Sequence, residues 1–340
     1  MQTETFGNFR ISVGIGDFLQ RPSPDWLIDG FLPATGLILL YGEPGVGKTF
    51  FVIDIACAAA SGSLWRRRPT RQGSVLLIAA EDSAGTRKRL SAYCIDNQVD
   101  YTNLDMRIGD RGIDLMNSSF VELVVEDLRC LDNPKVLVID TLAASAPGAD
   151  ENTSRDMSRF LNHCKQIYEA TGVVVIVIHH CGKDLSRGAR GWSGLKAAAD
   201  TVINIQKRSN HMVAIVEKQK NWTCGEVFGF RLKTVHMCPG NKMDTSCVVE
   251  HVDSILDPVD DDLGEIQRKV VRTLGELADE GGGVSEDDLL ARLVPSEAAP
   301  PEGVRDRRRE KYQRSIRTLV ERSVVISEYD LLRLDDGSPF

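Results

Sequence analysis

One short stretch of this chain has the residue types and the spacing that bind a phosphate group. It fits the pattern G-x-x-x-x-G-K-[ST] and consists of Gly42, Glu43, Pro44, Gly45, Val46, Gly47, Lys48 and Thr49. The glycines let backbone N–H groups turn toward a phosphate, and the N-terminus of the following helix adds a favourable partial charge. We expect Lys48 to reach the β- and γ-phosphates of a nucleotide and the Thr49 hydroxyl to bind Mg²⁺.

Two carboxylates that follow apolar runs are candidates to complete a nucleotide site. Asp140 ends the run 135–139, which is the pattern that holds Mg²⁺ opposite a phosphate-binding loop. Glu81 follows the run 75–80, where a carboxylate can orient and polarise an attacking water, because parallel sheets bind ligands at the carboxyl ends of their strands. The alternative is that Glu81 is merely solvated. We expect Asp82 to cap the next helix.

A pair of histidines, His179 and His180, closes the apolar run 173–178. A side chain in this position can report hydrolysis to the next loop by gaining or losing a hydrogen bond. The alternative is a structural role for both histidines. A zinc site that adds Cys181 is disfavoured because the ligand spacing does not match the usual patterns.

The elements that must position these side chains follow from the apolar pattern. Val/Ile/Leu runs without polar alternation indicate strands buried on both faces, so we predict an α/β fold with a parallel sheet. The predicted strands are 37–41, 75–80, 136–139, 173–178 and 201–205, followed by a hairpin of 211–217 and 226–233. Helical segments separate the first strands, beginning with 50–60 directly after the phosphate-binding loop.

The composition indicates a globular protein. The chain has 340 residues, of which 42% are hydrophobic and 26% charged, and its formal net charge is −8. No apolar run approaches the length of a bilayer span and no signal pattern is present, so we expect a cytoplasmic protein with no membrane partner. Because the chain is acidic, nucleic-acid binding requires local basic patches.

Four regions are predicted along the chain. They are an N-terminal arm or pocket cover (1–35), the α/β domain (36–250), an acidic linker (251–263) and a small C-terminal module (264–340). In the module we expect a helix from Ile266 to Ala278, a second helix capped by Ser285, a basic third helix at about 305–322 and a short hairpin. This order of elements is that of a winged helix.

The motifs together resemble a known family. The loop at 42–49, Ala-Ala-Glu-Asp at 79–82, Val-Leu-Val-Ile-Asp at 136–140 and His-His-Cys-Gly-Lys at 179–183 occur in one order. Over about residues 25–235 the chain resembles the RecA-like P-loop ATPases, and most closely the plasmid RepA-type hexameric replicative helicases. The resemblance implies a RecA-like core, a ring of subunits with ATP and Mg²⁺ at each interface, and single-stranded DNA in the central channel.

The resemblance also implies roles for individual residues. Lys48 and Thr49 would bind phosphate and Mg²⁺, Asp140 would support Mg²⁺, Glu81 would be the catalytic carboxylate, and His179 or His180 the sensor. A basic residue that reaches the neighbouring subunit's γ-phosphate is implied near Lys218 and Lys220. This chain has Lys220 where arginine is usual, and a lysine lacks the guanidinium fork. Arg208 is the competing candidate.

Two loops are expected to face the ring axis. The first, at about 143–156, is acidic and poorly suited to a phosphate backbone. The second combines basic residues, glycines and an aromatic ring, which suit single-stranded DNA. Its candidate residues are Lys183, Arg187, Arg190, Trp192 and Lys196. The alternative is an ordinary solvated loop with Trp192 in the core.

Two further basic clusters leave their partners open. Arg66, Arg67, Arg68 and Arg71 either contact nucleic acid or form a solvated helix end. The basic third helix of the C-terminal module suits duplex DNA, but its interleaved acidic residues leave open a contact with a replication protein or a neighbouring subunit, or a structural lid. Trp26 and Tyr41 are aromatic candidates for an adenine pocket.

These observations predict an ATP-driven motor on single-stranded DNA, a replicative helicase of plasmid or phage type. The alternative is an ATP-dependent DNA-binding protein with a regulatory or loading role and no unwinding activity. A small-molecule kinase is disfavoured, because Glu81 favours water as the nucleophile and no arginine-rich lid is evident.

Overall fold

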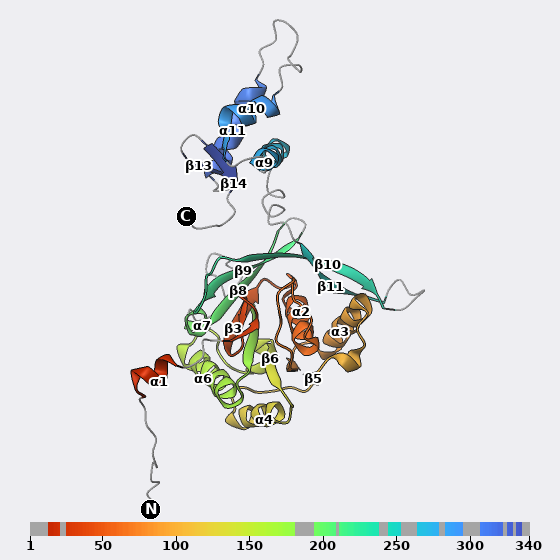
Figure 1. Cartoon of the computed structure of the whole chain (residues 1–340). Coiled ribbons are helices and arrows are strands. Elements are labelled where there is room, and N and C mark those ends of the chain that lie inside the picture. Colours follow the sequence, from red (N-terminus) through yellow and green to blue (C-terminus); the bar gives the residue numbers. More distant parts are fainter. Residues whose placement is uncertain are drawn as a thin grey trace, which may run out of the picture.

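The computed structural model (Figure 1) describes residues 13–20, 25–180, 194–208, 211–237, 244–252, 264–278, 283–294, 307–321, 325–328 and 331–334. Its centre is a nine-stranded sheet. Parallel strands form most of this sheet, in the spatial order β8 (Thr201–Lys207), β3 (Gly36–Gly42), β7 (Val174–His180), β6 (Pro134–Asp140), β4 (Ser74–Ala79) and β5 (Met106–Gly109). The sheet continues from β8 into the antiparallel strands β9 (Met212–Gln219), β10 (Val227–His236) and β11 (Thr245–Val252).

Helices cover both faces of the parallel strands, which explains why every residue of β3 and β4 is buried. One face packs against α2 (Lys48–Ser61) and α3 (Ser83–Asn97). The other packs against α4 (Ser118–Arg129), α5 (Leu142–Ser145), α6 (Ser154–Thr171) and α7 (Gly194–Ala198). A short 3₁₀ helix, η1 (Tyr101–Asn103), precedes β5, and α1 (Ile15–Leu19) lies near the start of the chain.

This arrangement is a RecA-like α/β core. β7 lies between β3, which carries the phosphate-binding loop, and β6, which ends in Asp140. All the strands predicted from apolar runs are present, and β9 pairs with β10 as the predicted hairpin. In Figure 1 the strands β9 to β11 pass over α2 and α3, and Phe51 of α2 contacts Phe230 of β10 with ring centroids 5.2 Å apart.

The structure adds four strands that the apolar pattern does not indicate. Residues within the predicted N-terminal arm form β1 (Trp26–Ile28) and β2 (Leu32–Pro33), and Leu27 and Phe31 are buried in the core beside α2. These residues are therefore part of the α/β domain. β5 is short and half-exposed, and β11 alternates too weakly to stand out from the surrounding loop.

The C-terminal module has its own hydrophobic core. It contains α9 (Glu265–Ala278), β12 (Val284–Ser285), α10 (Glu286–Leu293), α11 (Arg308–Glu321), β13 (Val325–Glu328) and β14 (Leu331–Leu334). The strands form a three-stranded sheet in the order β12-β14-β13. Ser285 caps α10 as predicted, accepting a hydrogen bond from the Asp288 N–H at 3.1 Å. The winged-helix assignment remains a prediction.

The predicted acidic linker falls largely on residues outside the described part of the chain. Among the helices that the structure describes, none combines the length and the apolar character needed to cross a membrane.

Candidate nucleotide-binding site

The phosphate-binding loop joins the end of β3 to the start of α2. Gly45 and Gly47 have φ angles of 80° and 88°, which side chains rarely tolerate, so glycine is required at both positions. A Cβ atom on Gly42 would lie 2.3 Å from the Ile205 carbonyl oxygen of β8. Lys48 is buried, and its ammonium group donates to the carbonyl oxygens of Gly42 at 3.0 Å and Glu43 at 2.8 Å. The lysine therefore closes the loop from inside.

His180 connects this loop with the candidate catalytic carboxylate. Its Nδ1 lies 3.1 Å from Lys48 Nζ, and its Nε2 lies 3.6 Å from Glu81 Oε2. A neutral ring that accepts from Lys48 at Nδ1 carries its proton on Nε2, the nitrogen that faces Glu81. The three side chains come from α2, from the end of β7 and from the second residue after β4, so they meet only at the carboxyl edge of the sheet.

Thr49 and Asp140 form the second contact of the site. Thr49 Oγ1 donates to Asp140 Oδ2 at 2.9 Å, and the Glu81 N–H donates to the Asp140 carbonyl oxygen at 3.2 Å. Burial raises the pKa of Asp140, although the hydrogen bond from Thr49 opposes this shift. A hydroxyl and a carboxylate side by side are oxygen ligands of the kind that Mg²⁺ prefers, so these residues fit the ion.

Arg89 also lies beside the site, although the sequence motifs do not point to it. Its guanidinium donates to Asp82 at 3.2 Å, lies 5.2 Å from the Phe50 ring centroid, and acts on Asp140 as a nearby positive charge. Asp82 also caps α3 as predicted, accepting from the Gly85 N–H at 2.8 Å. The spacing of seven residues between Asp82 and Arg89, two helical turns, is the signal that could have linked them.

The two histidines occupy opposite faces of β7. His179 pairs in register with Tyr41, is 1% exposed and lies on the face covered by α6 and α7. His180 pairs in register with Gly42 and lies on the face of the phosphate-binding loop. Alternation along the strand therefore places one histidine of the pair in the site and the other in the core.

Comparison with known sequences identifies the family. The sequence profile of the AAA domain family matches residues 9–186, which is more than half of the chain. The chain belongs to the AAA domain family. The matched part contains the loop at 42–49 together with Glu81, Asp140, His179 and His180. The AAA domain is thus a P-loop ATPase domain with a RecA-like core.

Two curated relatives are more distant and longer. The DNA repair protein RadA of Bacillus subtilis is 25% identical over 221 residues, 64% of this chain and 42% of that protein. The DNA repair protein RadA of Pseudomonas aeruginosa is 22% identical over 205 residues, 58% of this chain and 39% of that protein. The chain thus spans about two-fifths of the length of these relatives.

Two solved structures resemble the fold. One, described as an ATPase domain, has a TM-score of 0.44 and 15% identity, covering 58% of this chain and 81% of that one. The other, the RadB recombinase, has a TM-score of 0.45 and 16% identity, covering 59% of this chain and 89% of that one.

The candidate trans-acting lysines, Lys218 and Lys220, lie at the opposite edge of the sheet from the phosphate-binding loop of their own chain. Gln219 between them pairs with Thr201 at the start of β8, whereas Ile205, near the end of β8, pairs with Gly42. Lys220 forms an ion pair with Asp200 at 2.8 Å. With Trp26 and Trp222 it lines a cavity of about 810 Å³, so Trp26 is remote from the phosphate-binding loop.

Lys218 is held within its own chain. Its ammonium group donates to the carbonyl oxygens of Lys196, Ala197 and Ala199 at 3.1, 2.7 and 2.7 Å, at the end of α7. Burial lowers its pKa, and the neighbouring positive charge of Lys220 adds to this effect. Arg208 directly follows β8, at the same edge of the sheet as the phosphate-binding loop. Its Nε is buried without a hydrogen-bond partner among the described residues.

Lys196, a candidate DNA contact, has contacts within its own chain. It donates to the Tyr41 hydroxyl, lies 4.1 Å from the Tyr41 ring centroid and pairs with Glu217 at 2.8 Å. Burial alone would raise the pKa of Glu217, but hydrogen bonds from Lys196, Tyr41 and Asn204 outweigh it and hold that pKa below its usual value. The other candidates, Lys183, Arg187, Arg190 and Trp192, lie outside the described residues.

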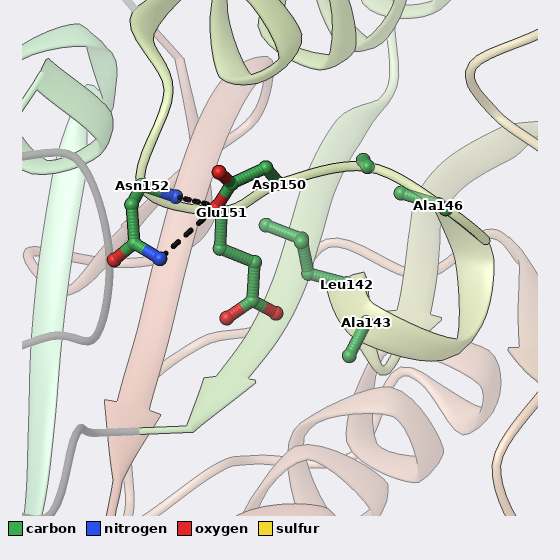
Figure 2. Close-up of a pocket in the computed structure, with 8 residues that line it drawn as sticks. Leu142, Ala143, Ala146, Asp150, Glu151 and Asn152 are labelled. Atoms are coloured by element: carbon green, nitrogen blue, oxygen red, sulfur yellow. Dashed lines mark hydrogen bonds between the residues drawn. The ribbon is translucent and has the colours of Figure 1, made fainter.

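The loop after β6 has the acidic character that the sequence indicates. It encloses a cavity of about 270 Å³ lined by Leu142, Ala146, Asp150, Glu151 and Asn152, among others (Figure 2). The Asn152 backbone and side-chain amides donate to Asp150 Oδ1 at 2.9 and 3.0 Å. Carboxylates at this position repel a phosphate backbone.

Most arginines of the cluster at Arg66 to Arg71 form hydrogen bonds or ion pairs with other residues of the same chain. Arg66 donates to the carbonyl oxygens of Gly229 and Val252, both at 2.8 Å, and lies 3.1 Å from His251 Nδ1. Arg68 pairs with Glu226, and Arg71 pairs with Asp25 at 2.9 Å. These guanidinium groups fasten the loop after α2 to other parts of the domain, which disfavours both a nucleic-acid contact and a merely solvated helix end.

For the zinc alternative, the described residues contain no group of three or more His, Cys, Asp or Glu side chains arranged to hold a metal ion. Cys181 lies outside those residues.

Proposed function

We propose that the protein is an oligomeric motor that hydrolyses ATP and acts on single-stranded DNA, built as a hexameric ring. The observation that carries this proposal is the convergence of Lys48, His180 and Glu81 at the sheet edge where Thr49 meets Asp140. A phosphate-binding group, a metal-binding pair and a carboxylate for water are the parts that ATP hydrolysis requires.

Each of these residues has a distinct role in the proposed reaction. The loop at 42–49 and Lys48 hold the phosphates, and Thr49 and Asp140 hold Mg²⁺, which would neutralise charge on the phosphate oxygens. Glu81 orients the attacking water. His180 contacts both Lys48 and Glu81, so a change in its hydrogen bond to Lys48 would alter its contact with Glu81. His179, buried on the opposite face, serves packing.

The proposal of a ring rests on the placement of the candidate trans-acting residues. Lys218 and Lys220 lie at the opposite edge of the sheet from the phosphate-binding loop of their own chain. If either lysine contacts a γ-phosphate, that phosphate therefore belongs to a neighbouring subunit's nucleotide. Arg208 remains the competing candidate. Of the three, Lys218 is the least suited, because its three carbonyl contacts hold it in place.

Single-stranded DNA is the proposed polymer, with Lys183, Arg187, Arg190 and Trp192 as its candidate contacts. The curated relatives are named as DNA repair proteins, which supports DNA as the partner. We place the protein in the cytoplasm with the replication machinery of a plasmid or phage.

A second candidate function is an ATP-dependent regulatory or loading protein that binds DNA without unwinding it. The acidic loop after β6 and the internal contacts of Lys196 favour this alternative, because carboxylates repel a phosphate backbone and Lys196 is already paired with Glu217.

Two assays separate the candidates. ATP hydrolysis should be measured with and without single-stranded DNA, and strand separation should be measured on a forked duplex. A motor gives DNA-stimulated hydrolysis together with unwinding. A loading protein binds DNA in the presence of ATP but leaves the fork intact, and that result would contradict the proposal of a motor.

A further inference from the structure

The C-terminal module carries a strong local charge that the proposed ATPase mechanism does not use. Residues 307–321, which include α11, contain six basic side chains against two carboxylates, a net charge of +4 in a chain whose overall charge is −8. Ile316 and Leu319 bury one face of α11 in the module's core. The charges therefore lie on the remaining faces of the helix.

One flank of α11 is fastened to α10. Arg309 pairs with Asp287 at 2.5 Å, and Gln313 donates to Glu286 at 3.3 Å. The ion pair neutralises one of the three carboxylates in the first turn of α10, and the Gln313 amide hydrogen-bonds a second. They also fix the orientation of α11, so the positions of its other side chains are set by the fold.

A groove runs along another flank, between α11 and the start of α9. It encloses about 780 Å³. Its walls include Arg307, directly before α11, together with Lys311 and Arg314 of α11, and the stretch from Gly264, directly before α9, to Gln267. Spacings of four and three residues put the three cations on one face of the helix. None of them forms an ion pair with another residue that the structure describes. Glu265 and Glu310 also line the groove, so cations exceed carboxylates there.

We propose that this groove grips the phosphate backbone of duplex DNA. From Arg307, directly before α11, to Arg314 the cations extend about 10 Å along the helix axis, at ~1.5 Å per residue. This length is comparable with the width of the major groove of DNA, about 12 Å. Duplex DNA thus offers a phosphate backbone on the scale of the cation row.

Two other polymers fit the groove less well. Single strands are usually held by stacking on aromatic rings, and the residues that line this groove include no aromatic side chain. A protein partner usually needs an apolar centre, and Ile266, which is 39% exposed, is the large apolar residue of the lining. The module would therefore hold duplex DNA independently of the nucleotide, next to a domain proposed to act on single strands.

The test uses the full-length protein without nucleotide and a fluorescent 30-base-pair duplex of arbitrary sequence. In a double variant, Lys311→Ala with Arg314→Ala, we expect binding at about 0.1 M salt to weaken roughly tenfold or more. The slope of log affinity against log salt should become shallower by about 2, because two phosphate contacts are lost.

The matched control, Arg129→Ala with Arg292→Ala, removes the same charge from exposed positions on α4 and α10 and should bind like the parent protein. Unlabelled single strand of the same length should compete poorly. Lys48→Ala should retain the duplex affinity, which separates this inference from the proposed ATPase function. Absence of duplex binding, an equal loss in the control, or preferential competition by the single strand would overturn it.

Discussion

At the scale of single residues, the adjacent histidines show how one position along a strand changes a role. His180 contacts Lys48 and Glu81, whereas His179 is packed in the core beside Tyr41. The two residues are chemically identical and neighbours in sequence. Only the face of β7 on which each lies distinguishes them.

Substituting each histidine by alanine should therefore give opposite results. His180→Ala should lower the rate of ATP hydrolysis about 100-fold with little change in melting temperature, because it removes a half-exposed contact of the site. His179→Ala should lower the free energy of unfolding by about 2 kcal/mol, because it empties a buried position. Steady-state ATPase rates and thermal melts of both variants check the pair; the reverse assignment would contradict it.

Glu81→Gln tests the proposed role of this carboxylate in orienting the attacking water. We expect hydrolysis to fall by about 100-fold or more while ATP binding stays within a few-fold, because the amide keeps the shape but cannot polarise water in the same way. Binding of a fluorescent ATP analogue and single-turnover hydrolysis measure the two effects separately. Turnover at the parent rate would remove Glu81 from the mechanism.

At the scale of elements, the antiparallel extension of the sheet is fastened to α2 by side chains far from it in sequence. Arg66 lies in the loop after α2 and donates to carbonyl oxygens of β10 and β11. Trp65 Nε1 donates to Asp54 of α2 at 2.8 Å, and His251 of β11 lies 3.1 Å from the same carboxylate. The covering of α2 thus depends on a few polar contacts around an aromatic cluster.

Replacing Arg66 by alanine should destabilise the AAA domain by about 2–3 kcal/mol, because charge-assisted hydrogen bonds to two carbonyl groups are lost. Arg71→Ala is the matched control. Its ion pair with Asp25 is exposed on both sides, so its loss should cost at most about 1 kcal/mol. Denaturant unfolding of the two variants checks the difference, and equal effects would contradict it.

Glu217 joins β9 to β3 and α7, and its pKa lies below the ordinary value of 4.5. A lowered pKa in the folded state contributes stability above pH 4.5 that is lost as the pH falls through the folded-state value. Glu217→Gln should therefore lower the melting temperature at about pH 7, and the gap from the parent protein should narrow below pH 4.5. A gap that does not change with pH would contradict this account.

At the scale of the whole molecule, the AAA domain and the C-terminal module have separate hydrophobic cores. The residues of the nucleotide site come entirely from the first, and the groove proposed for duplex DNA from the second. The two activities should therefore be separable.

Ending the chain at residue 263 tests this separation. We expect the shortened protein to keep its ATPase rate in the absence of DNA within about twofold, since no residue of the site is removed. Duplex binding should be lost. A large loss of the basal ATPase rate, with the α/β domain still folded by circular dichroism, would show that the module contributes to the nucleotide site.

The sequence by itself determines the parts that depend on local chemistry. The loop at 42–49 can be recognised because its glycines and its lysine are contiguous, and the parallel strands because burial on both faces requires unbroken apolar runs. The caps at Asp82 and Ser285 are equally local.

Only the tertiary structure decides which distant groups meet. It places His180 rather than His179 beside Lys48, pairs Arg89 with Asp82, pairs Lys196 with Glu217 and folds residues 26–33 into the core. These outcomes depend on the order of the strands in the sheet and on the face of the sheet on which each side chain lies. Neither is encoded in a short stretch of sequence, because each is fixed by the packing of elements far apart in the chain.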